Sequence, residues 1–467
     1  MQDNKRLEIF RSAPVPKAIL VNAIPAMVAM TMVLIYNLAD TFFIGQTKDP
    51  LMLAAVSIAS PAFLLFLTIG TAFGIGGTSV ISRAMGQGRH EYAKKVSSFC
   101  AWGAIVVGAA LAAGFLIFMD PLLRMIGATD GTIADARTYL TIVSFGGPFL
   151  VFGNAFSNII RAEGQSRRAM MGMLIGNLVN IVLDPIFILV LNWNVMGAAV
   201  ATLIGNVVNG AYYLIYFLRG KSMLSISPKD FSMKNKIFTG VMAIGIPAAA
   251  GNLLASVSHI VQNARMAQYN DLAVAGIGVA GKIMIITGII CVGLGNGIQP
   301  LLGFCVGARL WARFKKVLRY SLIFATILSV TLTALCYIFA PQIVSAFLDD
   351  QGASDYALTF VRILLITSFT FGIFYVLVST IQAIGAGVPA LIVNISRQGL
   401  IFIPMLFVME AAIGINGLAW AQPVADVLSL TMAVVFYFVA SRRIMKRLKA
   451  KDDADAERLE AIKEEVD

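Results

Sequence analysis

The stretch Ile24-Pro25-Ala26 recurs as Ile246-Pro247-Ala248, 222 residues further along the chain. A second pair of similar stretches, Arg161-Ala162-Glu163-Gly164 and Gln382-Ala383-Ile384-Gly385, is separated by 221 residues. A nearly constant offset between distant pairs indicates that one half of the protein repeats the other. In membrane transporters built from such repeats, the substrate lies at the interface between the halves. We therefore expect two lobes with a site between them.

The composition places this duplicated chain in a membrane. Of its 467 residues, 58% are hydrophobic and 13% are charged, whereas soluble domains carry roughly 25% charged residues. About twelve apolar stretches are long enough to cross a hydrocarbon core of about 30 Å. Long continuous runs predict helices, because the strands of a membrane barrel alternate polar and apolar residues. The predicted fold is an all-α integral membrane protein with twelve transmembrane helices in two six-helix lobes, with spans at 18–44, 51–81, 93–118, 138–161, 169–191, 196–218, 238–266, 272–303, 318–340, 359–385, 389–411 and 415–440.

The lysines and arginines predict the orientation of the chain. Most of these 36 residues lie in the N-terminal segment, the loops after even-numbered spans and the C-terminal tail, and loops rich in Lys and Arg stay in the cytoplasm. We expect a multi-pass protein of the cell inner (plasma) membrane with both termini cytoplasmic. The net charge of +11 suits anionic lipid headgroups and requires no nucleic acid. The expected parts are the N-terminal lobe 1–219 (helices 1–6), a cytoplasmic linker 220–237, the C-terminal lobe 238–447 (helices 7–12) and a charged cytoplasmic tail 448–467.

Other functional classes find little support in the sequence. The four cysteines are scattered within or next to spans, so they predict neither a disulfide framework nor a metal site. A membrane-embedded enzyme would need paired catalytic groups at one depth, and we identify none. A channel is disfavoured because two repeats with an off-centre acidic site favour alternating access. We expect no enzyme activity, no cofactor, no metal beyond Na⁺ as a coupling ion, and a monomer.

Two carboxylates inside the first lobe carry the functional argument. A charge at the bilayer centre costs on the order of 2.5–3.5 kcal/mol on insertion scales, yet Asp40 and Asp184 lie in the outer halves of their spans. The spans of this lobe offer no nearby Lys or Arg to neutralise them. Burial and a like-charged neighbour disfavour the ionised form, so a proton or Na⁺ would stabilise the pair. An organic cation would compete for the same charge.

Polar stripes in the same lobe predict a hydrated cavity. Asn177, Asn180 and Asp184 share one helical face, and two further stripes lie on spans 18–44 and 196–218. In lipid such stripes turn inward, either to line a cavity or to join helices by hydrogen bonds worth about 0.6 kcal/mol each. The stripe on span 196–218 consists of Thr202, Asn206, Asn209 and Tyr213, and the expected substrate-cavity residues are Tyr36, Asn37, Asn154, Asn177, Asn206, Asn209 and Tyr213.

The second lobe differs in its charges. At the repeat offset, Asp40 corresponds to Gln262 and Asp184 to Met405. In place of these acids the lobe carries two cations. The first, Lys282, either extends toward the membrane interface or pairs with Asp426. The second, Arg397, is expected to form a structural pair. The candidate residues of this lobe are His259, Gln262, Lys282, Arg397 and Asp426.

Several motifs resemble the MATE (multidrug and toxic compound extrusion) family of secondary transporters. The resemblance implies twelve helices in two lobes and H⁺- or Na⁺-driven export of amphipathic compounds. Matching motifs are Asn37-Leu38-Ala39-Asp40-Thr41 with Phe43-Ile44-Gly45, Arg161-Ala162-Glu163-Gly164 with Ala169-Met170, Asn177, Asn180, Asp184 and Pro185, Gly197-Ala198-Ala199 with Ala201-Thr202, and Gln299-Pro300 with Gly303 and Gly307.

The same resemblance implies a coupling site. The first-lobe cation site of the family combines an Asp on helix 1, an Asn and an Asp on helix 5 and a Thr on helix 6. Some branches also place acids on helices 7 and 10, where this chain has Gln262 and no acid after Arg362. The cation- or proton-coupling residues implied here are Asp40, Asn180, Asp184 and Thr202.

The expected function is secondary active multidrug efflux, in which H⁺ or Na⁺ is exchanged for amphipathic, often cationic, organic compounds by alternating access. The alternative is a flippase for lipid-linked precursors of the same superfamily. Flippases of that class tend to have extra helices and a basic cavity. The first-lobe cavity is expected to be acidic, whereas Lys282 and Arg397 leave the alternative open for the second lobe.

Overall fold

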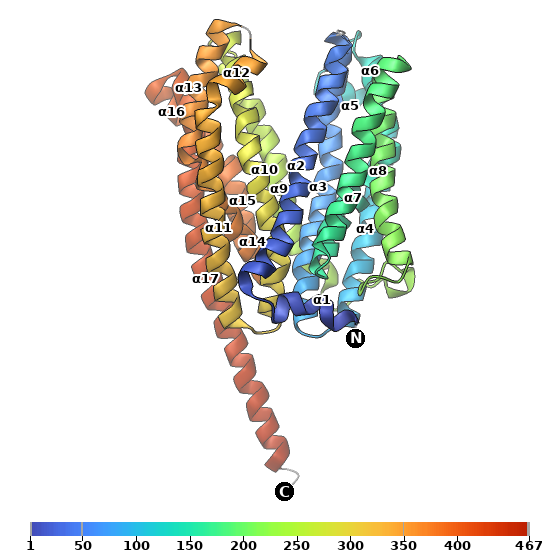
Figure 1. Cartoon of the computed structure of the whole chain (residues 1–467), viewed down its shortest axis with the longest axis vertical. Coiled ribbons are helices and arrows are strands. Elements are labelled where there is room, and N and C mark those ends of the chain that lie inside the picture. The colour runs from blue at the N-terminus through green and yellow to red at the C-terminus, as the bar shows by residue number, and fades with distance from the viewer. Residues whose placement is uncertain (1, 48–49, 349, 465–467) are drawn as a thin grey trace.

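The computed structural model describes residues 2–47, 50–348 and 350–464, so the last residues of the expected tail, 465–467, lie outside the described part. The long helices of the first half stand roughly parallel, and α1 lies across their lower end (Figure 1). Their bounds are α1 Gln2–Arg11, α2 Val15–Gln46, α3 Pro50–Gly86, α4 His90–Ile117, α5 Met119–Ile126, α6 Ile133–Ala162, α7 Ser166–Pro185 with the π turn η1 Ile186–Val190, and α8 Asn194–Leu218.

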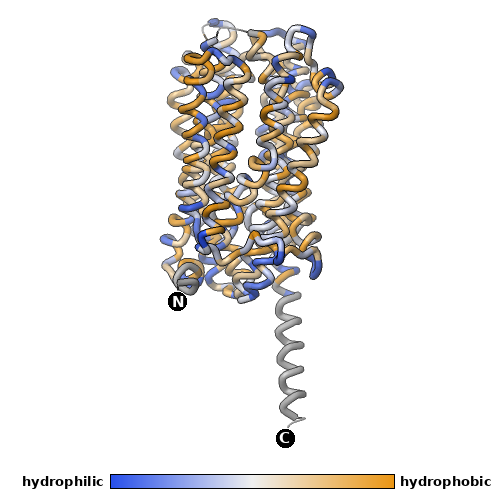
Figure 2. Tube along the Cα trace, turned by 90° about the vertical axis from the view of Figure 1, so that its right-hand side faces the viewer, coloured by the Kyte–Doolittle hydropathy of each residue, from blue (hydrophilic) through white to orange (hydrophobic). Residues whose placement is uncertain are grey.

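The second half repeats this plan after a linker that contains the short 3₁₀ turn η2. Its bounds are η2 Pro228–Asp230, α9 Ile237–Met266, α10 Asp271–Gly307, α11 Trp311–Ile338, α12 Ala340–Phe347, α13 Gln351–Ser368, α14 Phe371–Ile384, α15 Gly387–Ile395, the π turn η3 Ser396–Leu400, α16 Phe402–Ile413 and α17 Ile415–Glu464. Within the described residues, eleven helical runs are long and apolar enough to cross a membrane. Counting the bent pair α13–α14 as one span makes twelve. This confirms the all-helical membrane fold. Hydrophobic residues dominate the helix shafts and hydrophilic residues gather at the two ends (Figure 2).

The tenth span is bent rather than continuous. The sequence predicted one run over 359–385, but α13 and α14 meet at an angle of 48°. Side chains of α11 support the bend, because Ser329 Oγ donates to the Phe369 carbonyl at 2.5 Å and Thr333 shares a hydrogen bond with Ser368 at 2.8 Å. A hydroxyl that partners a freed backbone carbonyl makes such a break tolerable in lipid.

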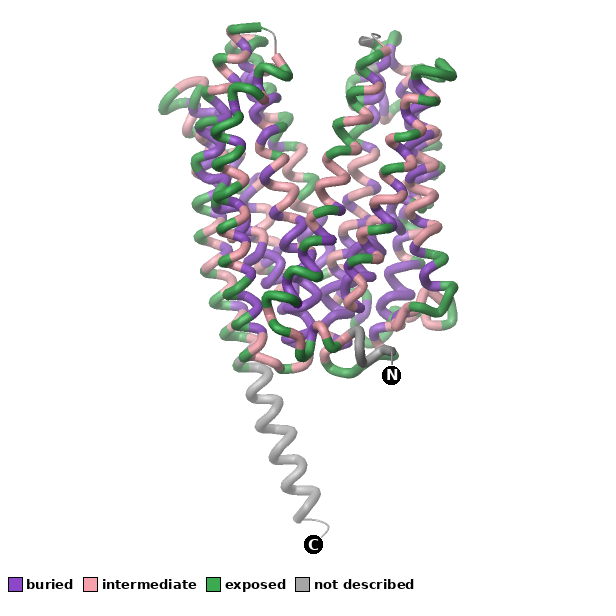
Figure 3. Tube along the Cα trace, in the orientation of Figure 1, coloured by how far each residue is buried: buried purple, intermediate pink, exposed green. Residues whose placement is uncertain are grey.

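The two groups of helices meet at one end and diverge toward the other. We call the end where α1 begins and α17 ends the base, and the opposite end the rim. Buried residues fill the space between the groups near the base, whereas intermediate and exposed residues face each other above it (Figure 3). At the base α2 packs against α10 and α3 packs against α9. The two groups thus stand apart toward the rim, and we call the cavity that is lined by residues of both groups the cleft.

Glycines allow the backbones to touch at the base. A Cβ at Gly76 of α3 would lie 2.2 Å from the Val241 carbonyl oxygen, and one at Gly245 of α9 would lie 2.1 Å from the Ala72 carbonyl oxygen. No side chain fits at either position unless the helices separate. The contact between α3 and α9 therefore depends on glycine on both sides.

Replacement of Gly245 by alanine is expected to wedge the base open, because the added methyl group meets rigid backbone, and overpacking of this kind costs about 1–3 kcal/mol. Double electron–electron resonance between spin labels on α3 and α9 near the base should report a longer distance than in the parent. Gly240→Ala is the matched control on the same helix, since its Cβ would meet only Val80 at 3.6 Å. Equal distances in both variants would contradict the role given to Gly245.

Candidate functional site

Three helices bring the four expected coupling residues together inside the first lobe. Asp184 on α7 is fully buried, and Asn180 and Thr202 are nearly so. With the Asn180 amide oriented to satisfy both of its polar atoms, its nitrogen donates to Asp184 Oδ2 at 3.1 Å and its oxygen accepts from the Thr202 backbone N–H at 3.1 Å. Asp40 on α2 lies close enough for its charge to interact with that of Asp184. We call Asp40, Asn180, Asp184 and Thr202 the carboxylate cluster.

Each carboxylate of the cluster keeps one oxygen open. Oδ1 of Asp40 and Oδ1 of Asp184 are buried and have no hydrogen-bond partner among the described residues. Buried polar atoms are nearly always satisfied, so two orphaned oxygens in one site need an explanation. The described residues hold no group of three or more His, Cys, Asp and Glu side chains placed for a metal ion. A proton fits these oxygens directly, whereas Na⁺ would need further amide, hydroxyl or backbone oxygens.

Two tyrosines adjoin the cluster. Tyr36 on α2 and Tyr139 on α6 both lie beside Thr202 and Asp40. Tyr36 was expected to line the substrate cavity, and it does so as well. Tyr139 was not predicted, because a tyrosine at the end of a span is usually part of the aromatic belt at the membrane interface. The sequence of one helix does not distinguish a tyrosine of the aromatic belt from a tyrosine that packs beside a buried site.

The chain around Asp184 departs from regular helix. Pro185 ends α7, since proline has no N–H to donate and its ring clashes with the preceding turn. The next residues, Ile186–Val190, form a π turn, a geometry that often accompanies functional sites. Asp184 thus occupies the last regular turn before the break.

A cavity of about 430 Å³ lies between the lobes and is lined by amides rather than acids. None of the described residues that line it is acidic, and Asp40 and Asp184 are not part of its lining. Three lining amides, on Asn177, Asn209 and Asn394, have a buried atom without a partner among the described residues. The lining asparagines are Asn37, Asn154, Asn158, Asn177, Asn206 and Asn209 from the first lobe and Asn252, Asn296 and Asn394 from the second.

Tyr213 is the one expected cavity residue that does not line this central cavity. Its side chain is fully buried, and its hydroxyl donates to the Ala169 carbonyl at 2.6 Å. A Cβ at Gly172 would lie 2.4 Å from its ring. The polar face of α8 is therefore open to the cavity at Asn206 and covered by α7 nearer the base.

The second lobe contains a buried ion pair. Arg397 Nε donates to Asp426 Oδ1 at 2.8 Å, and the same carboxylate accepts from Gln422 at 2.8 Å and Thr367 at 3.1 Å. The guanidinium also lies over the ring of Phe371, 4.4 Å from its centroid. Arg397 is thus paired, as expected.

The suggested pairing of Lys282 with Asp426 is not what the structure shows, because Asp426 forms its ion pair with Arg397 at 2.8 Å and the described residues contain no ion pair between Lys282 and Asp426. Lys282 Nζ lies instead 5.2 Å from the centroid of the Phe347 ring. Gln262 joins two helices, since its amide donates to the Leu418 carbonyl at 2.9 Å. His259, Gln262, Lys282 and Arg397 all line one further cavity, which we call the second-lobe cavity.

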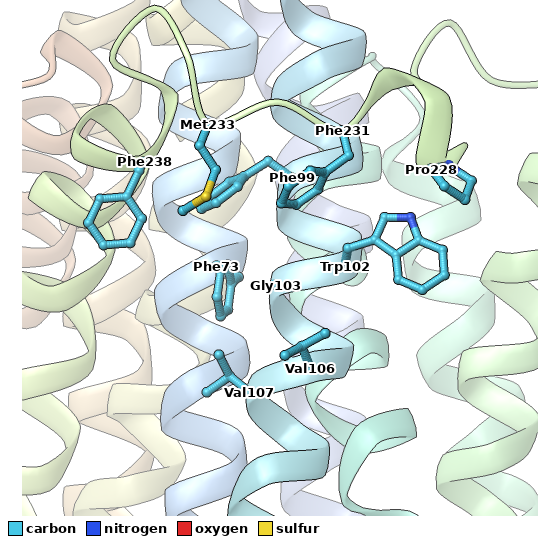
Figure 4. Close-up of a pocket in the computed structure, with 10 residues that line it drawn as sticks. All are labelled: Phe73, Phe99, Trp102, Gly103, Val106, Val107, Pro228, Phe231, Met233 and Phe238. Atoms are coloured by element: carbon cyan, nitrogen blue, oxygen red, sulfur yellow. The ribbon is translucent and has the colours of Figure 1, made fainter.

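An apolar pocket of about 480 Å³ lies apart from these polar sites. Figure 4 shows aromatic side chains of α3, α4 and the linker around it, with Phe238 of α9 on one side. Trp102 Nε1 donates to the Ile226 carbonyl at 3.2 Å and Ser98 Oγ to the Ser227 carbonyl at 2.7 Å, so the linker is tied to α4. The pocket packs the linker and supplies no group suited to ion coupling.

Comparison with known proteins agrees with this geometry. Multidrug export protein MepA of Staphylococcus aureus (strain NCTC 8325 / PS 47) is 29% identical over 441 residues, covering 94% of this chain and 97% of the relative. A structure described as the outward-facing conformation of a multidrug resistance MATE family transporter of the MOP superfamily superposes with a TM-score of 0.88 at 25% identity, covering 95% of this chain and 99% of that one. A MOP superfamily transporter from Pyrococcus furiosus Vc1 (DSM3638), whose structure is described by a reversed polarity of its binding pocket, has a TM-score of 0.87 at 26% identity, covering 94% and 98%.

The family match also reproduces the internal repeat. The MatE family model matches residues 25–186 and again residues 247–408. The two matches are offset by 222 residues, which is the offset between the two Ile-Pro-Ala stretches. With both halves matched, the chain belongs to the MatE family.

Proposed function

We propose that the protein is a secondary active multidrug efflux transporter that exchanges H⁺ or Na⁺ for amphipathic, often cationic, organic compounds by alternating access. The observation that carries the proposal is the pair of open carboxylate oxygens, on Asp40 and Asp184, beside a cavity between two repeated lobes. Relatives named as multidrug export proteins support it and favour a transporter over an enzyme.

The proposed orientation places the base in the cytoplasm of a cell with an inner (plasma) membrane, because the loops at that end carry most of the Lys and Arg. The cleft then opens to the outside. A single chain with both lobes suffices for the cycle, so a monomer is the proposed working unit.

The carboxylate cluster couples the two fluxes by competition. When the carboxylates are charged, they favour an organic cation in the adjacent cleft, and when they hold a proton or Na⁺, that attraction is lost. Entry of the coupling ion from outside would therefore release the substrate to the outside. The ion shifts the equilibrium between open states only as far as it binds them with different affinity.

The test is efflux of a fluorescent organic cation from proteoliposomes under an imposed pH gradient or an imposed Na⁺ gradient. We expect one gradient to drive efflux by the wild type and neither to drive it in Asp40→Asn. Asp130→Asn, at a 91% exposed side chain, is the control that should retain the wild-type rate. Wild-type efflux by Asp40→Asn would refute the assignment.

The same assay separates the alternative. Absence of gradient-driven efflux for every cation tested would favour the flippase for lipid-linked precursors. The flippase remains the second candidate because Lys282, which makes no ion pair with the described acidic residues, lines the second-lobe cavity.

A further inference from the structure

The second-lobe cavity adjoins the cleft and has its own set of lining residues. It has a volume of about 460 Å³ and lies among α9, α10, α13, α14, η3 and α17. Ile289, Val292 and Tyr375 line both this cavity and the central one. The two cavities therefore share part of their walls.

The charge of this cavity is positive. None of the described residues that line it is acidic. Arg397 is neutralised by Asp426 behind it, at 2.8 Å. Lys282 makes no ion pair with any acidic residue in the described part of the chain, and its ammonium lies over the face of the Phe347 ring, 5.2 Å from the centroid.

Lys282 has an exposed side chain that lies well inside its span. It follows Asp271, the first residue of α10, by eleven positions, which places it about 16 Å along the helix at about 1.5 Å per residue. It also lies three turns before Gly293, whose Cβ would meet Met27 of α2 at 2.7 Å. Lys282 thus shares the helical face of α10 that turns toward the opposite lobe, and its side chain lines the second-lobe cavity with the ammonium 5.2 Å from the Phe347 ring of α12.

Glycines of α10 create the room beside this lysine. Gly278 and Gly281 line the cavity, and a Cβ at either one would meet nothing within 4 Å. The rest of the wall includes apolar side chains, among them Ile277, Ile285 and Leu364, and also polar side chains from α9, η3 and α17. An amphipathic ligand suits such a wall, with a compact anionic group near Lys282 and an apolar body against the aliphatic side chains.

We propose that the second-lobe cavity is a binding site for amphipathic anions, with a carboxylate or phosphate ester held by the ammonium of Lys282 and the apolar body lying against the glycine face of α10. The site is separate from the carboxylate cluster and has the opposite sign. It stands whether or not the protein exports cations, because it concerns binding to a different lobe.

The test is isothermal titration calorimetry on the full-length protein in nanodiscs of neutral phosphatidylcholine, with 1-naphthoate as the anionic probe and 1-naphthylmethylammonium as its cationic counterpart of similar shape. We expect wild type and Lys282→Arg to bind naphthoate. Lys282→Gln should bind it about 10- to 100-fold more weakly, as for loss of one charge-assisted hydrogen bond. Gly281→Val, which narrows the cavity beside Lys282 without a clash at its Cβ, should weaken binding of naphthoate.

Folding is controlled by requiring each variant to elute as a single species and to melt within a few degrees of the parent. Unchanged affinity of Lys282→Gln for naphthoate, or equal loss of affinity for the cationic probe, would overturn the proposal. Nanodiscs that contain phosphatidylglycerol identify the source of the anion: loss of naphthoate affinity there assigns the site to lipid headgroups, and retained affinity assigns it to solutes of the cleft. Both of those results keep the anion site.

Discussion

Asp184→Asn is expected to abolish ion-coupled transport while the protein still inserts and folds. Asparagine has the shape of aspartate and can still bond to the Asn180 amide, which lies 3.1 Å from Asp184 Oδ2. It cannot take up a proton or bear a charge, so the open oxygen at Oδ1 is lost as a site for the coupling ion. Because coupling requires different affinities in two conformations, removal of the ion leaves no driving force for export.

The measurement is gradient-driven efflux from proteoliposomes, with expression and melting temperature as controls for folding. Efflux in the variant should fall to the rate seen without a gradient. Gln262→Ala, at the position that corresponds to Asp40 in the second lobe, removes hydrogen bonds to Leu418 and His259 but no carboxylate, and should cost less activity. A larger loss in Gln262→Ala than in Asp184→Asn would move the coupling site to the second lobe.

Arg397→Met is expected to destabilise the protein by about 3–5 kcal/mol, the range for leaving one member of a buried ion pair without its partner. The side chains of Arg397 and Asp426 are only 6% and 1% exposed, so water cannot solvate the carboxylate that remains. Replacement of both partners, Arg397→Met with Asp426→Leu, should restore most of the stability, because two apolar side chains leave no buried charge.

Thermal unfolding in one detergent measures this effect. Arg265→Met is the comparison, since that residue pairs with Glu410 at 2.9 Å but is 33% exposed. Its loss should lower the melting temperature less than the loss of Arg397. Equal shifts for Arg397→Met and the double variant would contradict the argument, because they would show that the uncompensated Asp426 is not the cause.

The sequence predicted the elements whose signal is local or repeated. The apolar runs are long enough to specify helices by themselves, and the repeat offset is carried by short stretches such as Ile24-Pro25-Ala26. The carboxylate cluster could be anticipated because Asn180 and Asp184 share one face of a single helix, and a charge in lipid has few alternatives to facing inward.

What failed depended on contacts between helices. Lys282 and Asp426 were plausible partners because they lie at similar depths in the membrane. Depth does not reveal which cation packs against the carboxylate, and in the structure that cation is Arg397. Tyr213 continues the polar face of α8, but α7 covers that face near the base. Tyr139 lies beside the carboxylate cluster because α6 packs against α8. No pattern within a single span predicts that contact.

The asparagine lining of the central cavity has a consequence for the chemistry of the compounds that pass through it. An amide both donates and accepts, and exchange of its two ends by rotation adapts it to either need. The nine asparagines that line the cavity can each offer a donor or an acceptor to a polar ligand. Most ligands would therefore find some hydrogen-bond partner, and none would find a fully complementary set. Such a lining would keep affinities modest and dwell times short across unrelated molecules. A cell relying on this protein could then clear a compound it had never encountered before, without waiting for a mutation to reshape the wall.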